Sequence, residues 1–585
     1  LPVTTADGSN HNRVVDPLTA QHATIARGAN ALKYGASTLG GAISFTSATA
    51  FDSPAAAVSL NGGSHGQRLA RVTAGRVFDE RFDGLIMLES KSWDGYREHN
   101  RQERRGVYAN AGWQITDTVA ARLYATVLQN DQELPGTLSR AQVETNPDRA
   151  SEQALNGNYQ INVDTWRLAA KSAWQVDSDR RFEFGVSVEE QSLFHPIVDR
   201  VLVDFDGPGP GRPVEVFSLL IDEDLRDVGT VLRYEHRIGQ HDLLAGFNYA
   251  SDRAEGGNYR NLGGIPNGLT SRIDNSAELF EAFAVDRVQL TGRTTFIIGA
   301  QAVSARRDVR TIDAETGSAD NPADDYSSIN PRVGLIYEPR DGFSLYTSLS
   351  RLFEPPTNYE LQDNVAGGDA TLDAMEGTVI EAGTRGQSDL GPRGTLEWDI
   401  AVYYARIENE ILSVEDPEAP GTSLATNVDD TVHAGVEGFL AARIPLARDS
   451  EQYLEPRLSF TVNEFHFDDD ANYGDNRLPA APRYVLAGEV MWRGARGFHA
   501  GPTFELAGRR YADFANRYSV DSYALLGLRA GFSGERWSVY ADVRNLLDES
   551  YIANHSVRNI AAPGDPILNP GAPLSAYLGI RYQIP

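Results

Sequence analysis

The 585-residue chain contains no cysteine and no long run of apolar residues. The absence of cysteine excludes both a disulfide framework and a zinc site built on thiolates. It is compatible with an oxidising compartment, where a free thiol is a liability. No stretch approaches the ~18 consecutive apolar residues of a membrane-spanning helix. The mean hydropathy of −0.37 is that of a soluble protein, but membrane barrels alternate apolar and polar residues and give only a weak signal of this kind.

Basic residues are scarce beside acidic ones, with 53 Lys and Arg against 81 Asp and Glu and a net charge of −28. A polyanionic surface repels the phosphates of nucleic acids, so we expect no nucleic-acid partner. The main interpretation of this charge is solvated acidic loops. Attraction of cationic ligands or Ca²⁺ to the surface is the alternative.

Signatures of catalysis and of metal binding are also missing. The 11 histidines are scattered, without an H-E-x-x-H motif or a pair spaced i, i+4. Carboxylate pairs are frequent, but 81 acidic residues make chance pairs inevitable. The acidic run 468–475 lacks the spacing and the glycine of a defined calcium loop, so we interpret it as a surface loop. We expect neither an enzyme nor a resident metal or cofactor.

From about residue 52 onward the dominant pattern is an alternation of period two, which predicts strands. Within 119–127 the odd-numbered residues Val119, Leu123 and Val127 form an apolar face, and Arg122 and Tyr124 lie on the other face. One face can therefore meet lipid while the other meets water. The last strand, expected over 576–584, alternates in the same way.

The connections between these strands are of two kinds. Short glycine-containing turns join the strands expected within 333–349 and within 526–543, which predicts two hairpins. Other connections are long and acidic, namely 131–157, 204–213, 313–325, 363–373, 415–430 and 468–476. Short turns that alternate with long loops are typical of outer-membrane barrels. A propeller would repeat at a fixed period, and the chain shows no such repeat.

The length predicts one large barrel with a second, smaller unit. Spread over about 22 strands, residues 52–585 provide roughly 24 residues for each strand and its connection, which suits a plugged outer-membrane barrel. Residues 1–51 are rich in small residues and lack a lipid-facing stripe. Because ~50 residues are marginal as an independent domain, we expect them to pack inside the barrel.

Residues 24–45 resemble the end of the plug domain of TonB-dependent receptors. That family pattern has an Arg-Gly pair, then Tyr-Gly, then Gly-Gly before a short apolar strand, and it is matched here by Arg27, Gly28, Tyr34, Gly35, Gly40 and Gly41. The glycine pair lets the backbone turn tightly where the plug meets the barrel wall. By resemblance, these six residues form the contact between plug and barrel, with Arg27 as the arginine that pairs with carboxylates of the inner wall.

Further segments resemble the same family in the expected order. They are 350–356, 372–383, Asn427 with 435–437, and 543–551 near the end of the chain. Segments 93–97 and 133–142 are similar to loops of ferric citrate-type and related siderophore receptors. Two departures stand out: the chain opens in the middle of the plug, without TonB box or leader, and it ends Gln583-Ile584-Pro585 instead of on an aromatic residue. We expect that the missing segments were removed.

The resemblance implies an all-β membrane protein: an antiparallel barrel of about 22 strands (52–585) with the C-terminal part of a plug (1–51) in its lumen. It also implies a location in the bacterial outer membrane, among outer-membrane lipid and lipopolysaccharide. The implied function is TonB-dependent import of a ferric siderophore or ferric citrate-like chelate, energised by TonB with the ExbB/ExbD complex. The chelate is then the transported ligand rather than a cofactor.

The binding residues that the resemblance implies lie near the start of the chain, where plug loops of the family point outward and touch the substrate. They are Thr5, His11, Asn12 and Arg13. Charge-assisted hydrogen bonds to the carboxylates of a ferric chelate are the interaction expected of Arg13. The alternative is a solvated plug loop. Inner-wall arginines such as Arg122 could line the path, and an inner-wall salt bridge is the alternative there.

Three other functions remain open from the sequence. The cargo could be cobalamin, a glycan or another metal chelate. The protein could instead be a receptor or assembly component that docks a partner protein without importing anything, which the long acidic loops would suit. A soluble secreted β-rich enzyme is the third, and the alternating strands argue against it because they predict insolubility without detergent.

Overall fold

The computed structural model describes residues 6, 19–27, 41–203, 214–415, 423–447 and 451–584. Almost all regular structure in these ranges is β-strand. Three short α-helices lie in connections, namely α1 (Arg140–Thr145), α2 (Glu152–Asn156) and α3 (Asn358–Gln362). No helix in the described ranges has the length and apolar character needed to cross a bilayer.

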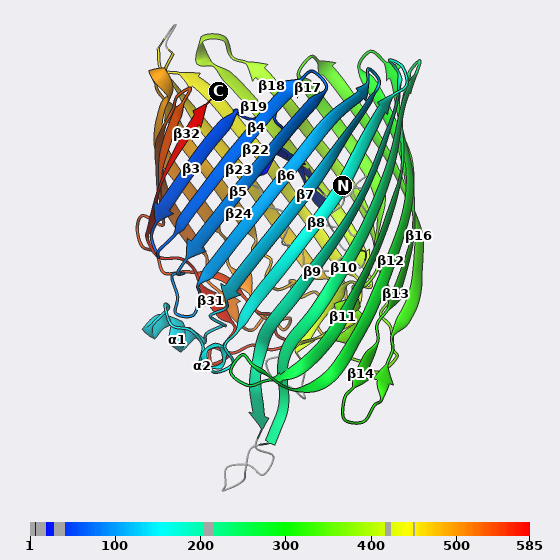
Figure 1. Cartoon of the computed structure of the whole chain (residues 1–585), viewed down its shortest axis with the longest axis vertical. Coiled ribbons are helices and arrows are strands. Elements are labelled where there is room, and N and C mark those ends of the chain that lie inside the picture. Colours follow the sequence, from blue (N-terminus) through cyan, green and yellow to red (C-terminus); the bar gives the residue numbers. More distant parts are fainter. Residues whose placement is uncertain are drawn as a thin grey trace.

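Twenty-two antiparallel strands close into a single barrel, as predicted (Figure 1). The barrel closes where its first strand, β3 (Ala56–Gly63), pairs with its last, β32 (Ser575–Ile584). Closure leaves no unpaired strand edge in the wall, which is what a lipid environment requires of a β-structure. The strands between them are β4 (Arg68–Asp79), β5 (Phe82–Trp93), β6 (Gln102–Thr116), β7 (Val119–Glu133), β8 (Gln160–Gln175), β9 (Arg180–Val203), β10 (Val214–Ile238), β11 (His241–Asn261), β12 (Pro266–Thr291), β13 (Thr294–Asp308), β16 (Ala323–Arg340), β17 (Phe343–Glu354), β18 (Met375–Asp389), β19 (Thr395–Glu408), β22 (Thr431–Pro445), β23 (Tyr453–Phe467), β24 (Tyr484–Arg493), β25 (Phe498–Ala507), β28 (Tyr523–Ser533) and β29 (Trp537–Arg544).

Eight short strands form hairpins in the connections between wall strands of the described chain. They are β14 (Thr311–Asp313) with β15 (Ala319–Asp320), β20 (Ile411–Glu415) with β21 (Ser423–Asn427), β26 (Arg510–Tyr511) with β27 (Ser519–Val520), and β30 (Ile552–His555) with β31 (Leu568–Pro570).

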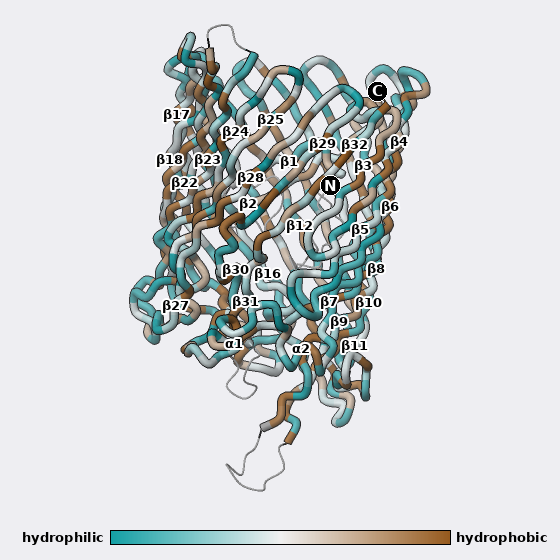
Figure 2. The backbone as a smooth tube through the Cα atoms, turned by 90° about the vertical axis from the view of Figure 1, so that its left-hand side faces the viewer, coloured by the Kyte–Doolittle hydropathy of each residue, from teal (hydrophilic) through white to brown (hydrophobic). Residues whose placement is uncertain are grey.

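The period-two alternation corresponds to the two faces of the wall, as predicted. On β7, Leu123 and Val127 are exposed to 62% and 56% and point away from the lumen, while Arg122, directly before Leu123, turns inward to pair with Asp83. Apolar side chains on the outer face can meet lipid, and the polar side chains of the other face line the interior. Figure 2 shows this mixture of apolar and polar residues along each strand.

The two ends of the barrel differ in their connections. Both predicted hairpins are confirmed, since β16 and β17 pair across a short turn and β28 and β29 do the same. The short turns lie at the end where β32 finishes, whereas α1, α2 and β14 lie at the opposite end (Figure 1). Because outer-membrane barrels have short periplasmic turns and long outer loops, the first end is periplasmic and the second extracellular.

The hairpin described before the barrel, residues 20–27 and 41–47, lies in its lumen (Figure 2). Strands β1 (Ala20–Arg27) and β2 (Gly41–Ser47) form an antiparallel hairpin separate from the wall, and both views place it within the barrel outline (Figures 1 and 2). Ala48, directly after β2, packs on Leu85, Met87 and Tyr108 of the inner wall. This is the arrangement expected of a plug remnant that continues into the first barrel strand.

Candidate functional site

Three extracellular connections pack into one layer at the mouth of the barrel. They are the loops 134–159, 508–522 and 545–574, and their buried cluster comprises Ala512, Tyr518, Val520, Ala561, Ile567 and Leu568. Leu138 and Leu568 join two of these loops by reciprocal backbone hydrogen bonds of 2.8 and 2.9 Å. The loops therefore support one another instead of extending separately into solvent.

A buried carboxylate holds two of these connections together. Asp513 is fully buried. Its carboxylate accepts hydrogen bonds from the backbone N–H groups of Arg517 (2.9 Å), Tyr518 (3.1 Å) and Ala561 (3.2 Å). A carboxylate that accepts several backbone donors stabilises a loop conformation that has few other partners for those donors. Asp513 thus fixes the shape of the loop layer from within.

Arg97 brings together the two segments that resemble loops of siderophore receptors. Its buried guanidinium donates to the carbonyl oxygens of Arg149 (3.0 Å) and Pro135 (3.4 Å) and to Asn569 Oδ1 (3.2 Å). Burial lowers the pKa of Arg97 from its ordinary value. Arg97 therefore joins the sequence motif at 93–97 to the motif at 133–142, which belongs to the loop layer.

Aromatic and acidic side chains lie where this layer meets the barrel wall. The rings of Tyr523 and Tyr551 lie 4.7 Å apart between centroids, and the Tyr523 hydroxyl donates to Glu505 at 2.8 Å. Because Leu528 on the same strand is exposed on the outer face, the alternation places Tyr523 on the lumen side. Trp93, at the end of β5, adds to the aromatic surface formed by Tyr523 and Tyr551. Its ring lies 6.0 Å from that of Tyr96. Half-buried aromatic faces beside a few polar groups are typical of small-molecule sites.

Most of the predicted plug residues lie outside the described residues. This applies to the proposed binding residues Thr5, His11, Asn12 and Arg13, and to Gly28, Tyr34, Gly35 and Gly40. Arg27 ends β1 and stands opposite Gly41 in the register of the hairpin. Gly41 has a φ of +122°, a conformation that favours glycine at the start of this strand. The assignment of these residues to ligand binding and to the plug–barrel contact stays a prediction.

The structure places Arg122 in an inner-wall ion pair, the alternative considered from the sequence. Its guanidinium contacts both carboxylate oxygens of Asp83, at 2.9 and 2.7 Å, and also donates to Asn110 Oδ1 at 2.6 Å. Asn110 in turn donates to the carbonyl oxygen of Ala48 at 3.0 Å. This chain of contacts holds the plug junction, the segment 48–55 between β2 and β3, against β5, β6 and β7. No sequence motif marked Asp83 or Asn110, because their partners come from other strands.

No group of three or more histidine and acidic side chains within the described parts of the chain is placed to hold a metal ion. In the acidic run near residue 470, the Asp470 carboxylate accepts from the backbone N–H groups of Asn472 (2.7 Å) and Tyr473 (2.8 Å). These are the contacts of a tight turn.

His555 is a buried titratable group in the loop layer. Its Nε2 lies 3.1 Å from the Tyr511 carbonyl oxygen, and its buried Nδ1 has no hydrogen-bond partner. Burial lowers the pKa of His555 below its ordinary value of 6.5, which the Tyr511 carbonyl only partly opposes. Because the folded state disfavours protonation, its stability is complete above pH 6.5 and decreases as the pH falls through the lower, folded-state pKa.

We therefore expect the hairpin β30–β31 to loosen in mild acid. Hydrogen exchange of the peptides that contain Tyr511 and 552–555, corrected for the intrinsic effect of pH, should accelerate as the pH is lowered below neutrality. His555→Gln keeps an N–H donor for Tyr511 but does not titrate, so its corrected exchange should not change with pH. Equal acid acceleration in both proteins would assign the effect to another group.

Comparison with known proteins gives the following matches. Residues 44–546 match the family described as TonB dependent receptor-like, beta-barrel. The ferrioxamine receptor of Yersinia enterocolitica is 21% identical over 94% of this chain and 78% of its own length. Among solved structures, the ferric citrate transporter FecA in unliganded form has a TM-score of 0.79 with 16% identity, covering 100% of this chain and 87% of its own. The siderophore receptor PiuA from Acinetobacter baumannii has a TM-score of 0.78 with 14% identity, covering 98% and 87%.

Proposed function

The chain belongs to the TonB-dependent receptor family, and from that premise we propose that it imports a ferric siderophore or a ferric citrate-like chelate. The family consists of outer-membrane transporters and receptors, not of enzymes. The observation that carries the proposal is the similarity to a ferrioxamine receptor over nearly the whole chain. The aromatic surface of Trp93, Tyr523 and Tyr551 under the extracellular loops supports it, because such a surface suits an amphipathic chelate.

The mechanism that we propose needs no covalent chemistry. The chelate binds between the extracellular loops and the plug, and the plug then rearranges when TonB, energised by ExbB/ExbD, acts on it from the periplasmic side. The loop layer favours the first step, binding of the chelate, because its packing around Asp513 presents a preorganised surface to the ligand. Outer-membrane lipid and lipopolysaccharide surround the apolar outer face.

The proposal is tested by equilibrium binding of ferric chelates to the purified full-length protein in detergent. We expect tight binding of one member of a panel containing hydroxamate, catecholate and citrate chelates. Arg13→Ala should weaken that binding about tenfold or more, since hydrogen bonds to charged groups contribute about 1.5–3 kcal/mol. Arg393→Ala, in an exposed turn at the periplasmic end, is the matched control and should bind like the wild type.

The other outcomes separate the remaining functions. If no ferric chelate binds, the proposal of ferric chelate import is wrong. The same binding measurement with cobalamin, glycans and other metal chelates then identifies a different cargo. If a chelate binds tightly but Arg13→Ala has no effect, the import proposal holds and the plug-side assignment of Arg13 is wrong.

A further inference from the structure

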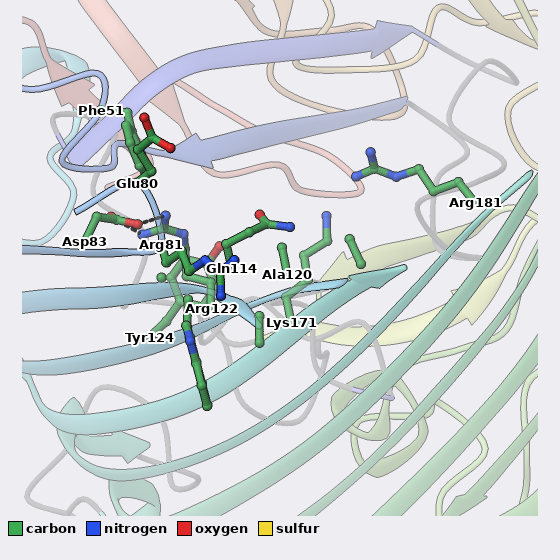
Figure 3. Close-up of a pocket in the computed structure, with 14 residues that line it drawn as sticks. Phe51, Glu80, Arg81, Asp83, Gln114, Ala120, Arg122, Tyr124, Lys171 and Arg181 are labelled. Atoms are coloured by element: carbon green, nitrogen blue, oxygen red, sulfur yellow. Dashed lines mark hydrogen bonds and ion pairs between the residues drawn. The ribbon is translucent and has the colours of Figure 1, made fainter. Parts of the chain in front are cut away.

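A cavity of about 260 Å³ opens at the periplasmic end of the barrel, far from the extracellular mouth. It lies beside the first turns of the wall, next to Phe51 of the junction between the plug hairpin and β3 (Figure 3). Residues of β5, β6, β7, β8 and β9 line it, among them Asp83, Arg122 and Lys171, whose side chains lie on the inner face of the wall. A solute that leaves the lumen for the periplasm on this side of the barrel passes the cavity.

The charge of the cavity is opposite to that of the protein as a whole. Four basic side chains line it, against two acidic ones, although the chain carries a net charge of −28. The basic residues are Arg81, Arg122, Lys171 and Arg181. A concave surface with an excess of one sign raises the local concentration of counter-ions more than a flat one does. The cavity is therefore a place where an anion can bind in an otherwise acidic molecule.

Two of the four cations have capacity for a further partner. Arg122 is already bound to both oxygens of Asp83. Lys171 and Arg181, by contrast, share the single carboxylate of Glu183, at 2.9 and 2.5 Å, and each side chain remains 41% exposed. Figure 3 shows both side chains reaching toward the same space from neighbouring strands. Two cations on one carboxylate leave one positive charge unbalanced and donor N–H groups directed toward solvent.

We infer that this cavity is an exit site that receives a small polycarboxylate, or the carboxylate groups of an anionic chelate, on its way into the periplasm. Lys171 and Arg181 supply the charge-assisted hydrogen bonds, and Arg81, which pairs with Asp117 at 3.8 Å, borders the cavity from the turn between β4 and β5. The volume is below the ~300 Å³ of a typical drug-sized site, which fits citrate or one arm of a larger ligand. The transport role of the site rests on the proposed import function, whereas anion binding itself does not.

The test uses paramagnetic broadening of fluorotryptophan resonances in the full-length protein in detergent, with ferric citrate as the probe. Trp113 lies on β6 beside the cavity, with its side chain on the outer face of the wall. Trp93 lies at the extracellular mouth, so the two resonances report on the two sites separately. Trp113→Phe and Trp93→Phe assign them. We expect ferric citrate to broaden Trp113, and diamagnetic gallium citrate to produce no broadening there.

We expect the double variant Lys171→Gln/Arg181→Gln to bind ferric citrate more weakly, because two charge-assisted contacts are lost. The ferric citrate concentration at which broadening of the Trp113 resonance is half-maximal should rise about tenfold or more. Broadening of Trp93 should not change. The conservative variant Lys171→Arg/Arg181→Lys should restore the response if charge, and not local folding, is responsible. Arg306→Gln, which removes a similarly exposed ion-paired arginine from the outer surface, is the control.

Failure of this inference differs from failure of the proposed function. If ferric citrate broadens the Trp113 resonance equally in the wild type and in the double variant, the inference of an exit site is wrong. This conclusion does not depend on the result at Trp93. If Trp113 responds as expected while no ferric chelate binds at the mouth, iron import is wrong and the cavity stands as an anion site. If both sites respond, the double variant should slow uptake into cells several-fold with no change in affinity at the mouth.

Discussion

Replacing Arg122 with alanine is expected to loosen the plug junction and to lower the stability of the neighbouring wall. The substitution removes the only cation that the structure places on the buried Asp83 carboxylate within the described residues. Breaking a buried ion pair by removing one partner costs about 3–5 kcal/mol, because the remaining charge is left without compensation. It also frees Asn110, which holds the Ala48 carbonyl.

The measurement is hydrogen exchange of the segment 48–55, together with single-channel conductance in planar bilayers. About 3 kcal/mol corresponds to roughly a hundredfold rise in the population of the opened junction. We expect exchange to accelerate by about that factor and ion conductance to rise above that of the wild type. The barrel itself should remain folded, since its ladder of wall strands is unaffected.

The double variant Asp83→Asn/Arg122→Gln is the control for charge. It removes both charges and retains polar groups that can hydrogen-bond each other, so it should lie much closer to the wild type than Arg122→Ala does. If Arg122→Ala leaves exchange of 48–55 unchanged, the junction is held by other contacts and the role given to Arg122 is wrong.

These contacts show which features can be predicted from local sequence patterns and which cannot. The alternation within 119–127 is a local property, and it correctly predicted the outward face of Leu123 and Val127 and the inward face of Arg122. The turns after Tyr337 and Phe532 are equally local. The pairing of Arg122 with Asp83 depends on the register of three strands, which local patterns do not determine. From the sequence, Arg122 could either line the path of the ligand or form a salt bridge in the inner wall. The assembled wall decides between these two interpretations.

The candidate site was less predictable than the fold for the same reason. Tyr523 and Tyr551 lie close together because a long connection returns to the barrel mouth, and Asp513 reaches the backbone of Ala561 across a separation of nearly fifty residues. No periodic pattern marks such contacts. Arg13 and His11 were chosen by resemblance alone, and their roles stay predictions because they lie outside the described residues.

Replacing Asp513 with alanine is expected to disorder the extracellular loop layer. Three backbone N–H groups, those of Arg517, Tyr518 and Ala561, lose a charged acceptor at a fully buried position. Each hydrogen bond to a charged group contributes about 1.5–3 kcal/mol, and losses within one network are not additive. A local cost of several kcal/mol follows, which is expected to raise the open population of the loop around Asp513 even though its apolar cluster remains.

Limited trypsin digestion measures this opening directly, because Arg517 and Arg558 flank the hydrogen bonds that Asp513 accepts. Cleavage after Arg517 should accelerate about a hundredfold, the factor that corresponds to roughly 3 kcal/mol. Asp513→Asn keeps one oxygen acceptor and should have a smaller effect. Asp521→Ala is the matched control: it removes an exposed carboxylate of the same loop, 78% accessible and paired with Arg140 at 3.4 Å.

The same variant connects loop order to ligand binding. A ligand that binds under a disordered layer must order the loops as it binds, and that cost lowers its affinity. Asp513→Ala should therefore weaken binding of the cognate chelate by at least about tenfold, mainly through faster dissociation, with Asp521→Ala close to wild type. Faster proteolysis with unchanged affinity would show that the ligand is held by the barrel wall and the plug alone, and that the loop layer has no part in binding.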